Sequence, residues 1–199
     1  MCTAVLVETA HYYVSRNTDV FCCLLDAIKA FDKVHHGKLF NLLFKRNISP
    51  LVIHLLLDSY TRQEVQVSWD NEKSCSFSVK NGVKQRGVLS PILFIVYIDE
   101  LILLLKDAGI GCHMGHSFVG ASGYADDLTL ISPSIRALNE MISICEKFAS
   151  KYSVTFNTVC IKFGSSVLKH DKVYLCGSEI EWADHVKHLG NVVNKHLSD

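Results

Sequence analysis

Apolar residues recur along this chain with two spacings, one typical of helices and one typical of strands. Helix-like spacing of three and four residues predicts helices over 4–13, 37–47, 50–60, 90–106 and 132–152. Apolar or alternating runs predict strands over 20–25, 64–69, 75–79, 128–131, 154–156, 160–163, 173–176 and 186–189, with a weaker pattern over 118–121. This order of elements indicates an α+β domain with a largely antiparallel sheet.

Acidic residues interrupt two of the apolar runs. Asp26 ends the buried run over 20–25, and Asp126 and Asp127 lie just before the run over 128–131. Neighbouring carboxylates repel, and each resists ionising beside the other unless a cation or solvent compensates. A divalent metal is one such partner. A polar hairpin tip is the alternative, because Asp is common in turns.

Two further segments complete the pattern. A hairpin is predicted over 64–79, and we expect its aromatic residues Trp69 and Phe77 to face the core. The glycine-containing loop 81–89 then leads into Ser90 and Pro91, a helix start with Ser as the cap and Pro at the first helical position.

The composition is that of an ordinary globular protein and limits how the chain could bind nucleic acid or a membrane. The chain has 199 residues, 49% of them hydrophobic, and its 20 basic residues balance its 20 acidic ones. A net charge of zero gives no global attraction to nucleic acid, so any such binding must rest on local patches or on further segments. The eight cysteines have no paired spacing and read as reduced, buried residues. The longest apolar run, 92–105, is shorter than the ~20 residues a bilayer requires and contains Asp99 and Glu100, so we expect no membrane span.

Three stretches together resemble a known family. Residues 25–34, 82–94 and 124–128 resemble, in order, the three central motifs of reverse transcriptases, and of the non-LTR (LINE-like) retrotransposon branch in particular. Each motif alone is weak, but three in sequence are specific. The resemblance continues through 188–190, similar to a strand motif that follows the palm. It implies a polymerase palm with helices packed on one face of the sheet, part of the fingers and no thumb.

The resemblance also implies an activity and a metal site. The activity is RNA-directed DNA polymerisation, with an RNA template, a DNA primer and deoxynucleoside triphosphates as partners. Two Mg²⁺ ions, or Mn²⁺ in their place, would activate the primer hydroxyl and stabilise the leaving pyrophosphate. Asp26 and Asp126 would hold the ions, and Asp127 is similar to the third carboxylate, which has a supporting part.

Substrate-binding residues follow from the same resemblance. Phe31 matches the aromatic steric gate that would clash with a 2′-hydroxyl, although a core aromatic beside a strand is the alternative. Gln85, Arg86 and Gly87 resemble the segment that packs against the incoming base and template, and Tyr124 belongs to the substrate-binding set. Arg86 could contact phosphate, or could be plain surface.

Departures from the family pattern keep other functions open. In the family, the glutamine is usually followed by Gly and then a small residue, but here Gln85 is followed by the bulky cation Arg86 and then Gly87. This departure predicts impaired catalysis or fidelity. Lys162 is a candidate for a lysine that the family carries soon after the position of Asn157. A catalytically inactive remnant with residual nucleic-acid binding is therefore an alternative, as is an RNA-templated RNA polymerase, against which Phe31 argues. We expect one palm-centred domain over 1–199, a fragment of a longer polyprotein without the basic finger strands and thumb.

Overall fold

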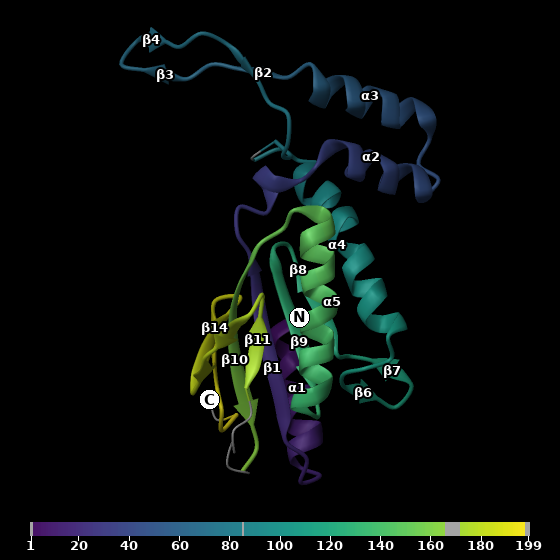
Figure 1. Ribbon diagram of the computed structural model, residues 1–199, viewed down its shortest axis with the longest axis vertical. Helices are drawn as coiled ribbons and strands as arrows, with labels where there is room; N and C mark the ends of the chain where they lie inside the picture. Colours follow the sequence, from purple (N-terminus) through teal and green to yellow (C-terminus); the bar gives the residue numbers. More distant parts are fainter. Residues whose placement is uncertain (1, 85, 166–171, 198–199) are drawn as a thin grey trace. The chain divides into compact units, whose positions relative to one another are not determined.

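A five-stranded sheet forms around the apolar strand that begins at Val20 (Figure 1). The computed structural model describes residues 2–84, 86–165 and 172–197. The chain divides into two units, the first made of Met1–Ile28, Glu100–Lys151 and Thr155–Asp199, the second of Lys29–Asp99 and Tyr152–Val154. The expectation of one domain over 1–199 stays a prediction, and each unit is described by itself.

The first unit contains the sheet, in the order β13-β10-β1-β9-β8. All its pairings are antiparallel except the short one between β10 and β13. Its helices and strands are α1 (Cys2–Val14), β1 (Val20–Ala27), β6 (His113–Met114), β7 (Ser117–Phe118), β8 (Ala121–Tyr124), β9 (Asp127–Ser132), α5 (Ile135–Tyr152), β10 (Phe156–Phe163), β11 (Val173–Leu175), β12 (Ser178–Ile180), β13 (Trp182–Ala183), β14 (His185–His188) and β15 (Asn191–Asn194).

The second unit is mainly helical. Its long segment begins just before a 3-10 turn, η1, and ends at Asp99, midway along α4, whose second half belongs to the first unit. Its elements are η1 (Phe31–Lys33), α2 (His36–Lys45), α3 (Pro50–Thr61), β2 (Glu64–Val65), β3 (Ser68–Trp69), β4 (Glu72–Lys73), β5 (Phe77–Ser78) and α4 (Ser90–Asp107).

Nearly every β1 residue is apolar, so both faces of the sheet need apolar cover, and both have it. On one face, Cys22 belongs to a buried core with Leu6 of α1 and Val186 of β14. On the other face, Cys23 lies near Cys145 of α5. The predicted α+β fold with a largely antiparallel sheet is thus confirmed. The expectation that helices pack on one face only is corrected, because α1 and α5 lie on opposite faces.

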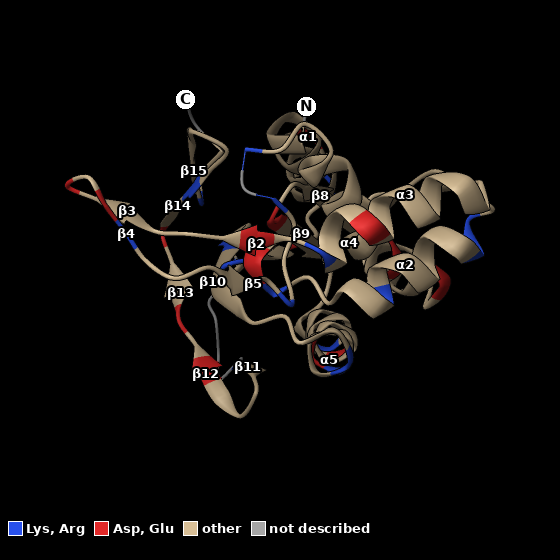
Figure 2. Cartoon of the chain, turned by 90° about the horizontal axis from the view of Figure 1, so that it is seen from above, with Lys and Arg blue, Asp and Glu red and all other residues tan. Residues whose placement is uncertain are grey.

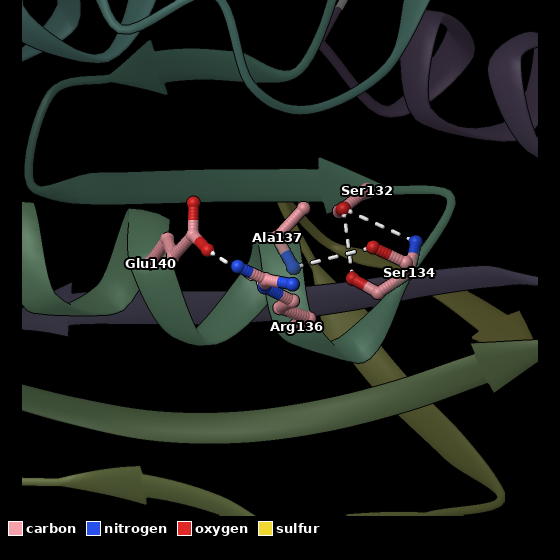
Figure 3. Close-up of polar contacts among 5 residues, drawn as sticks. All are labelled: Ser132, Ser134, Arg136, Ala137 and Glu140. Atoms are coloured by element: carbon pink, nitrogen blue, oxygen red, sulfur yellow. Dashed lines mark hydrogen bonds and ion pairs between the residues drawn. The ribbon is translucent and has the colours of Figure 1, made fainter.

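Helix α5 begins where two serines turn the chain after β9 (Figure 3). The amide of Ala137 donates to the Ser134 hydroxyl at 3.2 Å, and the Ser132 hydroxyl donates to the Ser134 carbonyl at 2.9 Å. The bond from Ala137 satisfies an amide that lacks a partner within the helix. Further along, Arg136 pairs with Glu140 at 3.2 Å. Helix α5 contains both basic and acidic residues (Figure 2).

Several predicted elements form with shifted boundaries. The two separate strands expected over 154–156 and 160–163 are one continuous strand, β10, since it pairs with the whole of β1. The expectation that Trp69 and Phe77 face the core is wrong, because their side chains are 82% and 50% exposed. Five cysteines are buried as predicted, but Cys75 and Cys176 are exposed. Within the described part of the chain, no helix combines the length and apolar character that crossing a membrane requires.

Candidate active site

Four polar side chains form a row across one end of the sheet. In the strand register Asn157 of β10 lies opposite Asp26 of β1, Asp26 lies opposite Asp127 of β9, and Asp127 lies opposite Tyr124 of β8. Directly opposed residues on neighbouring strands present their side chains on the same face, about 5 Å apart. The sheet therefore brings Asp26 and Asp127 together, although 100 positions separate them in the sequence.

Asp126 lies in the tight turn that joins β8 to β9. The turn is closed by the pair of Tyr124 and Asp127, so Ala125 and Asp126 are its two central residues. Ala125 has a φ of 52°, as the first position of hairpin turns commonly requires. The backbone amide of Ala27 donates to the carbonyl oxygen of Asp126 at 3.1 Å. This bond fixes the turn beside the end of β1, next to Asp26.

The three carboxylates create an electrostatic cost. Burial raises the pKa of Asp127, and the negative charges of Asp126 and Asp26 raise it further, while His188 acts in the opposite direction. The site thus resists ionisation of Asp127 beside its neighbours. A cation bound between them would remove this repulsion.

The three carboxylates, two in the row and Asp126 in the turn beside it, have the donor chemistry that a hard divalent cation binds. Asp26, Asp126 and Asp127 supply only carboxylate oxygens, the ligands that Mg²⁺ and Mn²⁺ prefer. Across the residues that the structure describes, no three or more His, Cys, Asp or Glu side chains already converge as a complete metal-binding group. The three carboxylates supply the charge and ligand type that a metal needs, and substrate oxygens commonly complete such sites.

A pocket of about 230 Å³ opens beside the row. Asp26, Asp127 and Asn157 line it together with Lys187 and His188 of β14. Burial lowers the pKa of His188, an effect that Asp127 partly offsets. The pocket places a neutral-leaning imidazole and an exposed lysine next to the carboxylates. The sequence had marked His188 only as part of a family motif, because its place opposite β9 depends on how the β14–β15 hairpin folds back.

The second unit holds the other candidate residues. Phe31 is half-buried at the start of η1, and its ring packs against Phe94 of α4 with centroids 5.1 Å apart. The backbone amide of Val83 donates to the Phe31 carbonyl at 2.7 Å. Gly82 has a φ of 92°, and a Cβ there would lie 3.0 Å from the Asp32 carbonyl oxygen. Residues 82 and 83 of the loop are therefore anchored to the turn that carries Phe31.

Arg86 adopts a backbone conformation that glycine favours. Its φ is 59° and its side chain is exposed. A Cβ on the next residue, Gly87, would lie 2.9 Å from the Lys84 carbonyl oxygen, so this glycine is sterically required. Gln85, the remaining candidate of this loop, lies outside the described residues. The loop thus keeps a tight backbone path although a bulky cation stands at a left-handed position.

Lys162 lies at the other end of β10 from Asn157. It is five residues further along the strand, about 17 Å at the usual rise per residue. It is nearly buried and pairs with Asp19 at 3.3 Å, with its ammonium group 6.0 Å from the centre of the Phe21 ring. The structure therefore answers the question left open about this lysine: it stabilises the far end of the sheet.

The family model described as "Reverse transcriptase (RNA-dependent DNA polymerase)" matches residues 4–193. This chain belongs to the reverse transcriptase family. The matched region includes the carboxylate row of the first unit and the Phe31 turn and 82–87 loop of the second. By ancestry, therefore, the chain is a reverse transcriptase domain.

Two relatives come from mobile elements of fruit flies. The chain is 28% identical to the "Retrovirus-related Pol polyprotein from type-2 retrotransposable element R2DM" of Drosophila melanogaster, over 83% of this chain and 17% of that protein. It is 25% identical to the "RNA-directed DNA polymerase from mobile element jockey" of Drosophila funebris, over 88% of this chain and 20% of that protein. These relatives confirm the predicted non-LTR branch. The chain spans about a fifth of their length.

Solved structures show the same fold at low sequence identity. The reverse transcriptase chain superimposes on apo telomerase from Candida tropicalis with a TM-score of 0.65 and 16% identity, covering 100% of this chain and 38% of that one. A second telomerase structure from the same organism, in complex with a fragment of telomeric RNA, gives a TM-score of 0.67 at 15% identity, covering 100% of this chain and 32% of that one. These likenesses support the palm architecture alone.

Proposed function

We propose that this reverse transcriptase domain extends a DNA primer on an RNA template by adding deoxynucleoside triphosphates. The observation that carries the proposal is the meeting of Asp26, Asp126 and Asp127 at one end of the sheet. A structural sheet end would gain nothing from three mutually repelling carboxylates, whereas a metal site requires them.

Each carboxylate has a distinct place in the proposed site. Asp26 projects from the end of β1, and Asp126 projects from the adjoining turn, so each can ligate a metal from a different element. Asp127 supports them from β9. Two Mg²⁺ ions, when bound, would activate the primer hydroxyl and stabilise the leaving pyrophosphate. The residues themselves hold the geometry, since the bond between Ala27 and Asp126 fixes the turn before any ligand arrives.

The proposed substrate-binding residues are Tyr124 of the first unit and Phe31, Gln85, Arg86 and Gly87 of the second. Phe31 would lie under the sugar and reject a 2′-hydroxyl, and its packing against Phe94 holds the ring in place. Gln85, Arg86 and Gly87 would pack against the incoming base and template, and the exposed Tyr124 would contact substrate beside the carboxylates. The ring contact of Phe31 also fits the alternative of a core aromatic, which makes sugar selectivity the deciding measurement.

Primer extension on poly(rA)/oligo(dT) tests the proposed activity. The unaltered chain should incorporate thymidine nucleotides in the presence of Mg²⁺, and Asp126→Asn should abolish incorporation because a metal ligand loses its charge. Asp107→Asn, an exposed carboxylate at the end of α4, is the matched control and should retain full activity. Undiminished incorporation by Asp126→Asn would remove this residue from the metal site. No incorporation by the unaltered chain would favour the inactive remnant.

A further inference from the structure

His188 is a buried imidazole whose two ring nitrogens both have hydrogen-bond partners. Nδ1 lies 2.9 Å from the Thr3 hydroxyl of α1, and Nε2 lies 3.1 Å from the Thr129 hydroxyl of β9. The Thr3 hydroxyl also donates to the His188 carbonyl at 3.4 Å. The side chain is only 4% exposed. Thr3, His188 and Thr129 thus form a Thr–His–Thr bridge.

The bridge connects three elements of the first unit directly behind the carboxylate row. Thr129 lies two residues after Asp127 on β9, so both side chains point to the same face of the sheet. His188 ends β14 and lines the 230 Å³ pocket together with Asp127 and Asp26. Its ring therefore occupies the position from which β14 can set the placement of the catalytic end of β9.

The turn that follows His188 faces a second cavity. Leu189 and Asn191 line a pocket of about 940 Å³ together with Gly123 and Tyr124, which belong to the hairpin carrying Asp126. The bridge thus ties two turns together: the one after β14 and the one that carries the carboxylates. Any shift of β14 relative to β9 would change the cavity and the carboxylate row at the same time.

We propose that His188 is a positioning residue of the polymerase site, which holds β9 through Thr129 so that Asp127 keeps its place beside Asp26. This inference rests on the proposed metal-dependent function. Hydroxyls can donate or accept. With its proton donated to the His188 carbonyl, the Thr3 hydroxyl accepts from Nδ1–H, and the Thr129 hydroxyl donates to Nε2 of the neutral ring. Because the bonds are buried and directional, removing one leaves a polar group without a partner and releases the strand that it held.

Three substitutions separate positioning from simple packing. The amide of Gln reaches the place of Nε2, and that of Asn reaches the place of Nδ1, whereas Phe keeps the volume of the ring without its bonds. His188→Gln should retain the bond to Thr129 and bind Mn²⁺ within about twofold of the unaltered chain. His188→Asn and His188→Phe should weaken Mn²⁺ binding about tenfold, the usual loss when an outer partner of a metal ligand is removed.

Mn²⁺ binding is measured by the electron paramagnetic resonance signal of free Mn²⁺, with the urea midpoint of each variant recorded alongside. Thr129→Val should cause the same loss as His188→Phe, and the double variant should lose no more, because both remove the bond between His188 and Thr129 that holds β9. The control is His185→Asn, at the exposed start of the same strand, which should leave Mn²⁺ affinity unchanged. Where the unaltered chain extends primers, the losses should fall on kcat rather than on the KM for primer–template.

The outcomes distinguish failure of the inference from failure of the function. If the unaltered chain binds Mn²⁺ and His188→Phe binds it equally well, the positioning role is refuted and the metal site stands. Losses that follow the urea midpoints for Gln, Asn and Phe alike would also refute it, since packing would then explain them. If the unaltered chain binds no Mn²⁺, the proposed metal site fails and the positioning role fails with it.

Discussion

Replacing Arg86 by glycine should stabilise the protein, contrary to the usual effect of a glycine substitution. The φ of 59° places Arg86 in the left-handed region, which costs a residue with a Cβ about 1–2 kcal/mol and costs glycine nothing. Glycine gives up about 0.4–1 kcal/mol through the greater freedom of the unfolded chain. The side chain of Arg86 is exposed, so little packing is lost. The net gain in the free energy of unfolding is about 0.5–1 kcal/mol.

The matched control for Arg86→Gly lies two residues further along the same loop. Val88 is 89% exposed and is not among the residues with positive φ, so Val88→Gly should lower the free energy of unfolding by about 0.5–1 kcal/mol. Urea denaturation followed by circular dichroism compares the two variants with the unaltered chain. If Arg86→Gly destabilises the chain as much as Val88→Gly, the left-handed backbone carries no strain and the reasoning is refuted.

The same variant tests the functional cost of Arg86. If the bulky cation impedes the approach of substrate, Arg86→Gly should raise template-dependent incorporation in the primer-extension assay. An increase in stability without any increase in extension would show that Arg86 strains the loop but does not limit the reaction.

Three further changes probe other parts of the chain. Phe31→Val should raise the use of ribonucleotides relative to deoxyribonucleotides in primer extension, and unchanged selectivity would leave Phe31 as a packing residue only. The pKa of Asp127 is raised in the folded state, so the unaltered chain loses stability as pH rises from about 4 through that pKa. Asp127→Asn should therefore be more stable than the unaltered chain at neutral pH and lose this advantage in acid. Urea midpoints of the two proteins that run parallel across pH would contradict this. Gly164→Ala should destabilise the chain more than Gly177→Ala, since both have positive φ but only the Cβ at 164 would overlap the carboxylate of Asp19; equal urea midpoints would show that this carboxylate moves away freely.

Much of the fold follows from local pattern. The run from Val20 is short and apolar without polar alternation, which predicts a strand buried on both faces. Pro50 marks the start of α3, because proline fits the first helical turn. Pattern failed where the environment decides burial. Trp69 looked like a core residue, yet the short β3–β4 hairpin has no apolar layer over it and leaves the ring exposed.

The site divides in the same way. That Asp26, Asp126 and Asp127 come together could be predicted from their residue types and order, and the structure places them at one end of the sheet, while their role as metal ligands stays a prediction. Lys162 could not be placed from sequence, since its position depends on β10 running as one strand against β1, which carries the lysine away from Asn157 and towards Asp19.

By itself the sequence determined the strands, the helices and the three carboxylates, since these depend on the apolar spacing and the side-chain chemistry of neighbouring residues. Only the tertiary structure decided the register that sets Asp26 against Asp127, the bond that holds Asp126 beside β1, and the burial of His188 between Thr3 and Thr129. The reason is physical: strand register and hairpin return are fixed by packing between segments far apart in the chain, which no local pattern records.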